Sequence, residues 1–211
     1  MTESDAPRWI SVVASGDASI APDLAVVSFA VSGSSKELAA TRDDVNRRSS
    51  AVLAALRELG IGDADLNAPD LAVSPEYDYR KGQRLIGYRA SRQMTARVRD
   101  LDLLGPVQDA LTTSGANEVH GARMEASDPS AAEHEALAAA MTAARAKAEV
   151  LAVAAGTALG GVVRVEEEAD LGPPMPKMAM MQAADMGGIP TETVAADLTI
   201  SRRIRAWFSI E

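Results

Sequence analysis

Five methionines fall close together in a stretch of the chain that is also rich in proline. Thioether sulfurs are soft ligands that prefer Cu(I), and they also oxidise readily to the sulfoxide. Flexible methionine side chains equally fill irregular gaps or form an adaptable contact surface. Because residues 171–190 contain no histidine or cysteine to anchor a soft metal, the composition favours a contact or packing role over copper binding. The candidate interaction loop therefore consists of Met175, Met178, Met180, Met181 and Met186.

The other residues with reactive or metal-binding side chains form no recognisable motif. His120 and His134 are the only histidines, and neither lies in an H-E-x-x-H or other paired spacing. Glu166 to Glu168 and Asp170 offer oxygen ligands for a hard cation, but consecutive residues on a strand point to opposite faces, so at most two would converge. No G-x-S-x-G elbow is present. The sequence thus predicts no catalytic residue, no metal site and no cofactor, and a protein that is not an enzyme.

Composition argues against several further classes of function. The formal net charge is −9, and basic residues alternate with acidic ones, which is unfavourable for nucleic-acid binding. Aromatic residues make up only 3%, so Val, Leu, Ile and Ala must build the core. Cysteine is absent, which removes disulfides and thiolate chemistry. With 211 residues, the chain can form one domain or two small, closely packed ones.

The start of the chain bears on location. Residues 1–8 are polar and acidic, without a basic segment followed by an apolar one, and no apolar run approaches the roughly 18 residues of a membrane span. We therefore expect a disordered segment at residues 1–8 and a single domain over residues 9–211. The protein is expected to be soluble and cytoplasmic, with no membrane span.

The first half of the chain alternates between strand and helix patterns. A short strand from Ile10 to Ala14 is expected to end in a Ser15-Gly16-Asp17 turn, and a second strand runs from Leu24 to Val31. A helix is predicted from about Ser35 to Leu59, because apolar residues recur at helical spacing there. Two alternating stretches then form a hairpin around Lys81-Gly82 that has one wet face.

The second half repeats this alternation with a longer helix. A short helix from Leu101 to Thr113 and a strand from Asn117 to Glu125 precede an alanine-rich helix that runs from Pro129 to about Ala155. Strands follow at Val162 to Glu166 and at Val194 to Ile210. The stripe of the alanine-rich helix predicted to be buried is Leu137, Met141, Ala144, Ala148 and Leu151.

One residue interrupts the alternation of the last strand. Apolar residues of one parity run from Val194 to Ile210, and Arg202 alone breaks the row. A charged residue in a core-facing row indicates an irregular pairing, so we predict a bulge or a bend near Arg202.

Five segments stand in a distinctive order and spacing along the chain: Ser15 to Asp23, Leu56 to Ile61, Ile86 to Ala90, Ser114 to Ala116 and Lys147 to Glu149. Together they resemble the SIMPL domain family. The resemblance covers residues 9–210 and implies an α+β fold of antiparallel strands with long helices. It also implies self-assembly in some relatives, an association with envelope or oxidative stress, frequent periplasmic location among bacterial relatives, and no established catalytic residues.

These observations predict an α+β protein in which antiparallel strands pack against two long amphipathic helices and one short helix. We expect a bacterial, non-enzymatic, oligomer-forming interaction or scaffold protein with a link to stress. Its expected partners are further copies of itself and another protein, with no nucleic acid and no membrane span. The alternative is a small-ligand or copper-binding protein that uses the methionine-rich loop.

Overall fold

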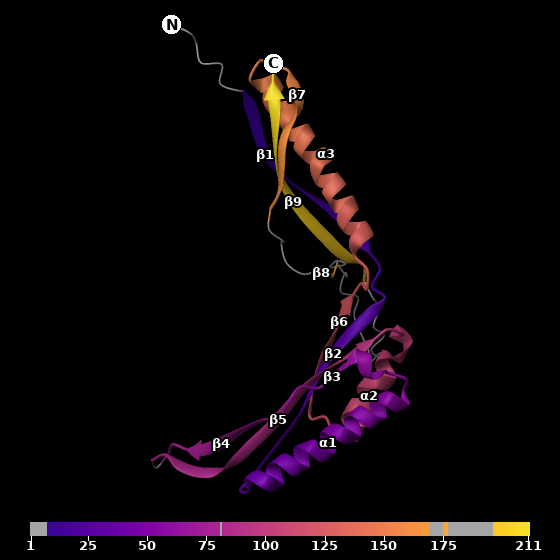
Figure 1. The fold of residues 1–211 in the computed structure, drawn as a ribbon, viewed down its shortest axis with the longest axis vertical. Helices are drawn as coiled ribbons and strands as arrows, with labels where there is room; N and C mark the ends of the chain where they lie inside the picture. Colours follow the sequence, from indigo (N-terminus) through magenta and orange to yellow (C-terminus); the bar gives the residue numbers. More distant parts are fainter. Residues whose placement is uncertain (1–7, 81, 169–174, 177–195) are drawn as a thin grey trace, which may run out of the picture. The chain divides into compact units, whose positions relative to one another are not determined.

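The computed structural model describes residues 8–80, 82–168, 175–176 and 196–211 (Figure 1). These residues divide into two compact units, a terminal unit that contains those up to Pro22 and from Ala126 onward, and a central unit from Asp23 to Glu125. Both units pair antiparallel strands and place helices against them, which confirms the predicted α+β class. The single domain predicted over residues 9–211 stays a prediction. The disorder predicted for residues 1–8 falls outside the described residues except at Arg8.

The central unit contains a five-stranded antiparallel sheet among its described residues. β2 (Leu24–Ser35) lies between β5 (Arg84–Val98) and β6 (Glu118–Glu125). On its other side, β5 pairs with β4 (Ala72–Asp78) and with the short β3 (Leu66–Asn67). The expected hairpin is therefore formed by β4 and β5.

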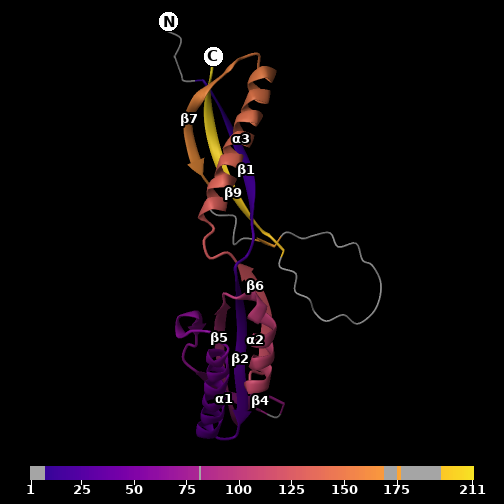
Figure 2. The same ribbon diagram turned by 90° about the vertical axis from the view of Figure 1, so that its right-hand side faces the viewer.

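Two helices pack on one face of the central sheet and form the core of the unit together with it. The long α1 (Leu38–Glu58) and the short α2 (Leu104–Ser114) bury their apolar stripes against the sheet (Figure 2). Strand alternation sends every second residue of β2 and β5 to the same side. Burying one large aliphatic side chain there stabilises the fold by roughly 1.5–3 kcal/mol. The largest fully buried members of this core are Val27, Phe29, Val31, Val45, Val52, Leu56, Met94, Val98, Val107 and Leu111.

The first long helix begins later than its sequence pattern predicts. β2 continues to Ser35 because Ser34 and Ser35 pair with Arg89 and Tyr88 of β5. The Ser35 hydroxyl then accepts the Glu37 amide at 3.2 Å, and α1 starts at Leu38. The longer β2 supports the hairpin strand that pairs with it.

The terminal unit is built from strands at opposite ends of the chain. Its sheet has the order β1 (Trp9–Ile20), β9 (Leu198–Ile210) and β7 (Leu159–Glu167), and the short β8 (Met175–Pro176) also pairs with β9. The long α3 (Ser130–Ala154) packs on β1 and β9 (Figures 1 and 2).

The turn predicted at Ser15-Gly16-Asp17 is wrong, since β1 runs through it without interruption. Gly16 faces α3 at a point of backbone contact. A Cβ at this position would lie 2.2 Å from the Ala140 nitrogen and 2.3 Å from the Ala136 oxygen. Glycine is needed here so that the helix can approach the strand closely. In the sequence, such a glycine cannot be distinguished from one that forms a turn.

The buried stripe predicted for the alanine-rich helix is also wrong in part. Ala144 and Ala148 are buried as expected, but Leu137 and Met141 are only half-buried and Leu151 is exposed. Because α3 approaches the strand backbone closely at Gly16, small side chains fill the contact. The buried row consists of Ala132, Ala136, Ala140, Ala144, Ala148 and Ala152.

The bulge predicted near Arg202 does not occur. The pairing of β1 with β9 is continuous through Gly16 and Arg202, and the irregularities lie instead in β7 around Val162. Arg202 shares the helix-facing side of β9, where the absent side chain of Gly16 leaves room. Its guanidinium reaches Glu133 of α3 at 2.5 Å, so an ion pair allows the charge to lie in the row.

Candidate functional site

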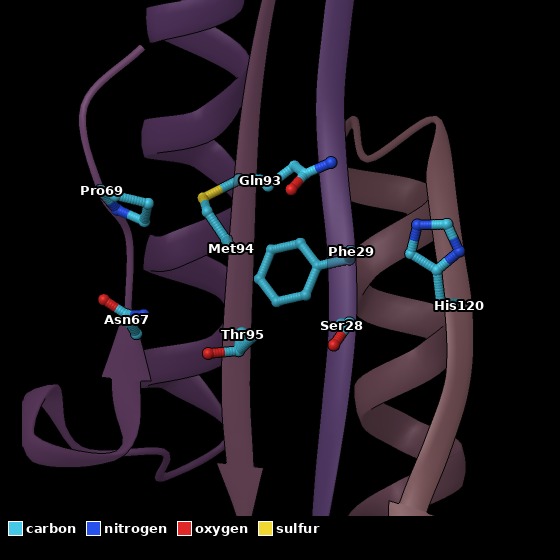
Figure 3. Close-up of a pocket in the computed structure, with 8 residues that line it drawn as sticks. All are labelled: Ser28, Phe29, Asn67, Pro69, Gln93, Met94, Thr95 and His120. Atoms are coloured by element: carbon cyan, nitrogen blue, oxygen red, sulfur yellow. The ribbon is translucent and has the colours of Figure 1, made fainter. Parts of the chain in front are cut away.

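A hollow of about 270 Å³ lies on the open face of the central sheet, opposite the helices (Figure 3). Figure 3 shows that its lining comes from the adjacent strands β5, β2 and β6, from Asn67 at the end of β3, and from Pro69 in the chain that follows. We call it the open-face pocket. The lining residues are Ser28, Phe29, Asn67, Pro69, Gln93, Met94, Thr95 and His120.

A short excursion of the chain creates one wall of this pocket. Residues 68–71 leave the sheet between β3 and β4, and Arg92 holds them by donating to the carbonyls of Ala68 at 3.0 Å and Pro69 at 2.7 Å. A second hollow of about 410 Å³ shares Pro69 and Gln93 with the first. The two hollows therefore form a trough along the edge of β5.

The chemistry available in the open-face pocket is hydrogen bonding. Amides and hydroxyls from Asn67, Gln93 and Thr95 can donate to and accept from a neutral ligand. His120 is the only ionisable side chain in the lining. Catalysis of proton transfer or acyl transfer requires an acid, base or nucleophile in mutual reach. The lining thus supports binding better than reaction.

Large aliphatic side chains are exposed in the terminal unit, over the end of α3 and along β7. Their exposed fractions range from 42% for Val162 to 78% for Val153. Large exposed apolar side chains that gather into a patch often mark a surface that binds a partner. We call this set the aliphatic segment: Val150, Leu151, Val153, Val162, Val163 and Val165.

A shallow hollow of about 370 Å³ borders the aliphatic segment beside β1. Val12, Val13, Val150 and Leu151 give it an apolar lining. Lys147 closes one side and donates to the Val13 carbonyl at 3.0 Å. Since β1 lies at the edge of the described sheet, this contact covers one of its outward carbonyls, and the hollow remains open to an apolar side chain.

The acidic run at the end of β7 is divided among three arginines. Glu166 pairs with Arg164, Glu167 lies 3.8 Å from Arg202, and Glu168 binds Arg205 at 2.9 Å. Alternation along the strand separates the carboxylates, as the sequence predicts. Asp170 lies outside the described residues.

The two histidines fall in different units. His120 lines the open-face pocket of the central unit, whereas His134 is exposed on α3 of the terminal unit. Among the described residues, no three His, Asp or Glu side chains gather in a way that would hold a metal ion. Within the same described residues, none of the helices has the length and hydropathy needed to cross a bilayer.

The candidate methionine loop lies almost entirely outside the described residues. Only the backbone of Met175 is placed, where it pairs with Thr199 of β9. Met178, Met180, Met181 and Met186 are not among the described residues. Their role as a contact surface or a copper site stays a prediction.

Sequence reasoning missed both the trough and the aliphatic segment. The signal for the trough was the stretch at residues 62–70, which contains three aspartates and Pro69. The signal for the aliphatic segment was the exact four-residue recurrence of alanine from Ala132 to Ala152. That recurrence marks a contact made by small side chains.

Comparison with known proteins gives one consistent family. The model of the family described as "SIMPL: Protein of unknown function (DUF541)" matches residues 10–208. The chain is 32% identical over 185 residues to an uncharacterized protein YggE of Edwardsiella ictaluri, covering 86% of this chain and 77% of the relative. It is 34% identical over 176 residues to a 26 kDa periplasmic immunogenic protein of Brucella melitensis, covering 81% and 70%. The YggE protein of Escherichia coli is 29% identical over 183 residues, covering 85% and 74%.

The predicted cytoplasmic location is wrong in the light of these relatives. The Brucella proteins are named as periplasmic, and they share most of their length with this chain. The prediction rested on the polar and acidic residues 1–8 and on the lack of a long apolar run. None of the relatives named above carries the name of an enzyme.

Proposed function

The chain belongs to the SIMPL family, and from that premise we propose that it is an oligomer-forming interaction protein of the bacterial periplasm, without catalytic activity of its own. The periplasmic location is inferred from the named location of the Brucella relatives. The observation that carries the proposal is the aliphatic segment of the terminal unit. A link to stress stays a prediction.

The partner proposed for the aliphatic segment is a second copy of the chain. Val150, Leu151 and Val153 are held outward by the alanine row that packs on the other side of α3. Removing apolar surface from water contributes roughly 25 cal/mol per Å². Two identical copies can cover this surface reciprocally about a two-fold axis, which is the commonest symmetry of homo-oligomers.

The open-face pocket supports the non-enzymatic part of the proposal. A single exposed imidazole, His120, faces neutral amides and hydroxyls there. The carboxylates of β7 are bound to arginines and lie in the other unit. Convergent acid, base and nucleophile groups are what catalysis requires, and this distribution separates the ionisable side chains.

Light scattering coupled to size-exclusion chromatography tests the proposal. The expected mass of the natural chain is a multiple of 22.0 kDa. Replacing Val150, Leu151 and Val153 together with serine should return the mass to that of one chain. Replacing the exposed Ala138 and Ala146 of the same helix with serine is the matched control and should leave the mass unchanged. A natural chain that stays monomeric at high concentration would contradict the proposal.

A second candidate function is the binding of a small neutral ligand. The observation in its favour is the open-face pocket with its polar lining, and substitution of Gln93 by alanine should then abolish saturable binding. The alternative of copper binding depends on the methionine loop. Copper binding by the loop can be tested by titrating Cu(I) into the natural chain and into a variant in which Met178, Met180 and Met181 are changed to leucine. Equal uptake by both proteins would exclude the loop as the copper site.

A further inference from the structure

The β4–β5 hairpin ends in a two-stranded ribbon that the helices leave uncovered. Figure 1 shows the end of this ribbon lying clear of α1 and α2. The first three residues of β5, from Arg84 to Ile86, are exposed, and most of β4 is exposed as well. We call the described residues 77–80 and 82–86 the hairpin tip. Its surface does not contribute to the core of the central unit, so core packing does not dictate which residue types occur there.

One face of the hairpin tip is aromatic and aliphatic. Tyr77 pairs directly with Leu85 across the ribbon, and Tyr79 follows just beyond the end of β4. The two tyrosine rings lie 6.3 Å apart. Tyr79 is 72% exposed and Leu85 is 45% exposed. The chain has only three tyrosines, and two of them stand at this tip.

The hairpin tip is also basic in an acidic protein. It contains the cations Arg80 and Arg84 against the single carboxylate Asp78, while the whole chain has a formal charge of −9. Asp78 accepts the backbone amide of Arg80 at 2.9 Å. Within the described residues, neither guanidinium at the tip forms an ion pair, whereas arginines such as Arg89, Arg99 and Arg205 do. The two guanidinium groups are therefore available to an external anion.

We propose that the hairpin tip binds peripherally to an anionic phospholipid surface. Arg80 and Arg84 would bind headgroup phosphates, since guanidinium groups match phosphate oxygens in geometry and charge. Tyr79 and Leu85 would enter the interfacial layer, where amphipathic aromatic rings are favoured. A two-stranded ribbon leaves edge amides and carbonyls unpaired, so it cannot enter the hydrocarbon interior. The contact is confined to the headgroup region.

The size of the tip favours a lipid surface over a protein partner. A stable protein interface usually buries about 800 Å² on each partner and involves roughly 20–30 residues a side. The tip offers only the end of one hairpin. Insertion of a few side chains into a soft, planar layer needs no such matching surface. The charge of the rest of the chain does not prevent this, because exposed charges are screened beyond about 8 Å at physiological ionic strength.

Vesicle flotation tests this proposal independently of self-association. The natural chain is mixed with phosphatidylcholine vesicles that either contain or lack phosphatidylglycerol. Binding is expected only to the anionic vesicles and should weaken with salt. Arg84→Ser should reduce partitioning about fivefold, from the usual contribution of one cation near an anionic surface. The double variant Tyr79→Ser, Leu85→Ser should reduce partitioning onto the anionic vesicles by more than Arg84→Ser does, by about tenfold further, because the burial of both side chains in the interface is lost.

Arg47→Ser is the matched control, because Arg47 is an exposed arginine on α1 far from the hairpin tip in sequence. It should leave partitioning nearly unchanged. Circular dichroism confirms that each variant is folded. Absence of binding to anionic vesicles, or equal binding by the natural chain and the tip variants, would overturn the proposal. So would a loss of oligomer mass in the tip variants without any vesicle binding, since the tip would then contact a second copy.

Discussion

The two long helices of this protein pack on their sheets with side chains of opposite size. α1 points Val45, Val52 and Leu56 into the core of the central unit. α3 points a row of alanines at its sheet and leaves large aliphatics such as Leu151 outside. Both helices carry enough large apolar residues to build a core. The two helices differ in the size of the side chains that their sheets can accommodate at the contact.

The sheet opposite each helix explains the choice. β1 presents Gly16 to α3, and the helix backbone approaches it so closely that only small side chains fit between them. In the central unit, β2 presents Val27 and Phe29, and α1 meets them with large side chains. Because protein interiors are close-packed, a short distance between helix and sheet requires small side chains and a longer one requires large side chains. The terminal unit thereby holds its aliphatic side chains where a partner can reach them.

Among the substitutions considered, Gly16→Val should have the largest effect on stability, because it disrupts the contact between β1 and α3. The new side chain would overlap the α3 backbone at Ala140 and Ala136, which cannot move as the end of a flexible side chain can. We expect a loss of about 3 kcal/mol or more in the free energy of unfolding of the terminal unit. Both tryptophans, Trp9 and Trp207, lie in that unit, so urea unfolding followed by tryptophan fluorescence reports it selectively.

Gly161→Val is the control for this substitution. A Cβ at Gly161 meets open space on β7 of the same unit. Its unfolding midpoint should stay close to that of the natural chain. If Gly16→Val unfolded at the same urea concentration as the control, close backbone contact would not be what selects alanine in α3.

A pair of leucine substitutions sharpens the comparison between the helices. Leu56→Ala in α1 should cost the central unit about 3 kcal/mol, because it leaves a cavity in a fully buried site. Leu151→Ala in α3 should change the stability of a dilute, monomeric protein by less than about 0.5 kcal/mol, because the side chain is exposed. Amide exchange of α1 and tryptophan fluorescence measure the two effects. Equal losses would mean that Leu151 faces a core.

The smallest expected effect concerns pH and the central unit alone. The hydrogen bond from Arg99 holds the pKa of Asp65 below its ordinary value of 3.8. A lowered folded-state pKa means that this contact stabilises the unit above pH 3.8 and is lost as the pH falls toward the lowered value. Asp65→Asn should therefore be less stable than the natural chain at neutral pH, and the difference should vanish in acid. A difference that persists at low pH would assign the loss to packing.

Much of the fold followed from local patterns in the sequence. Alternation identified the β4–β5 hairpin and β9, and helical spacing placed Val45, Val52 and Leu56 on one face of α1. These features depend on each segment alone. The orientation of α3 depends on Gly16, more than a hundred residues away in the chain, and single-segment periodicity ranks Leu137 above Ala136. Long-range backbone contact was therefore the information that the pattern lacked.

The candidate site was less predictable than the fold. The open-face pocket depends on residues 68–71 leaving the sheet, and on the bonds from Arg92 that hold them there. Its amides and hydroxyls are ordinary residues for a solvent-facing strand. At the level of sequence, His120 was considered and assigned no role. Its neighbours Gln93 and Asn67 were not considered, because only tertiary structure brings β3, β5 and β6 together.

Thiol labelling provides the most direct test of the outward aliphatic segment. Because the natural chain has no cysteine, Leu151→Cys introduces a single reactive group. We predict that it is labelled rapidly in dilute solution and more slowly as protein concentration rises, whereas Thr142→Cys, also exposed on α3, is labelled at one rate throughout. A Leu151→Cys rate that is independent of concentration would contradict self-association through this surface, and slow labelling even at high dilution would contradict the orientation of α3.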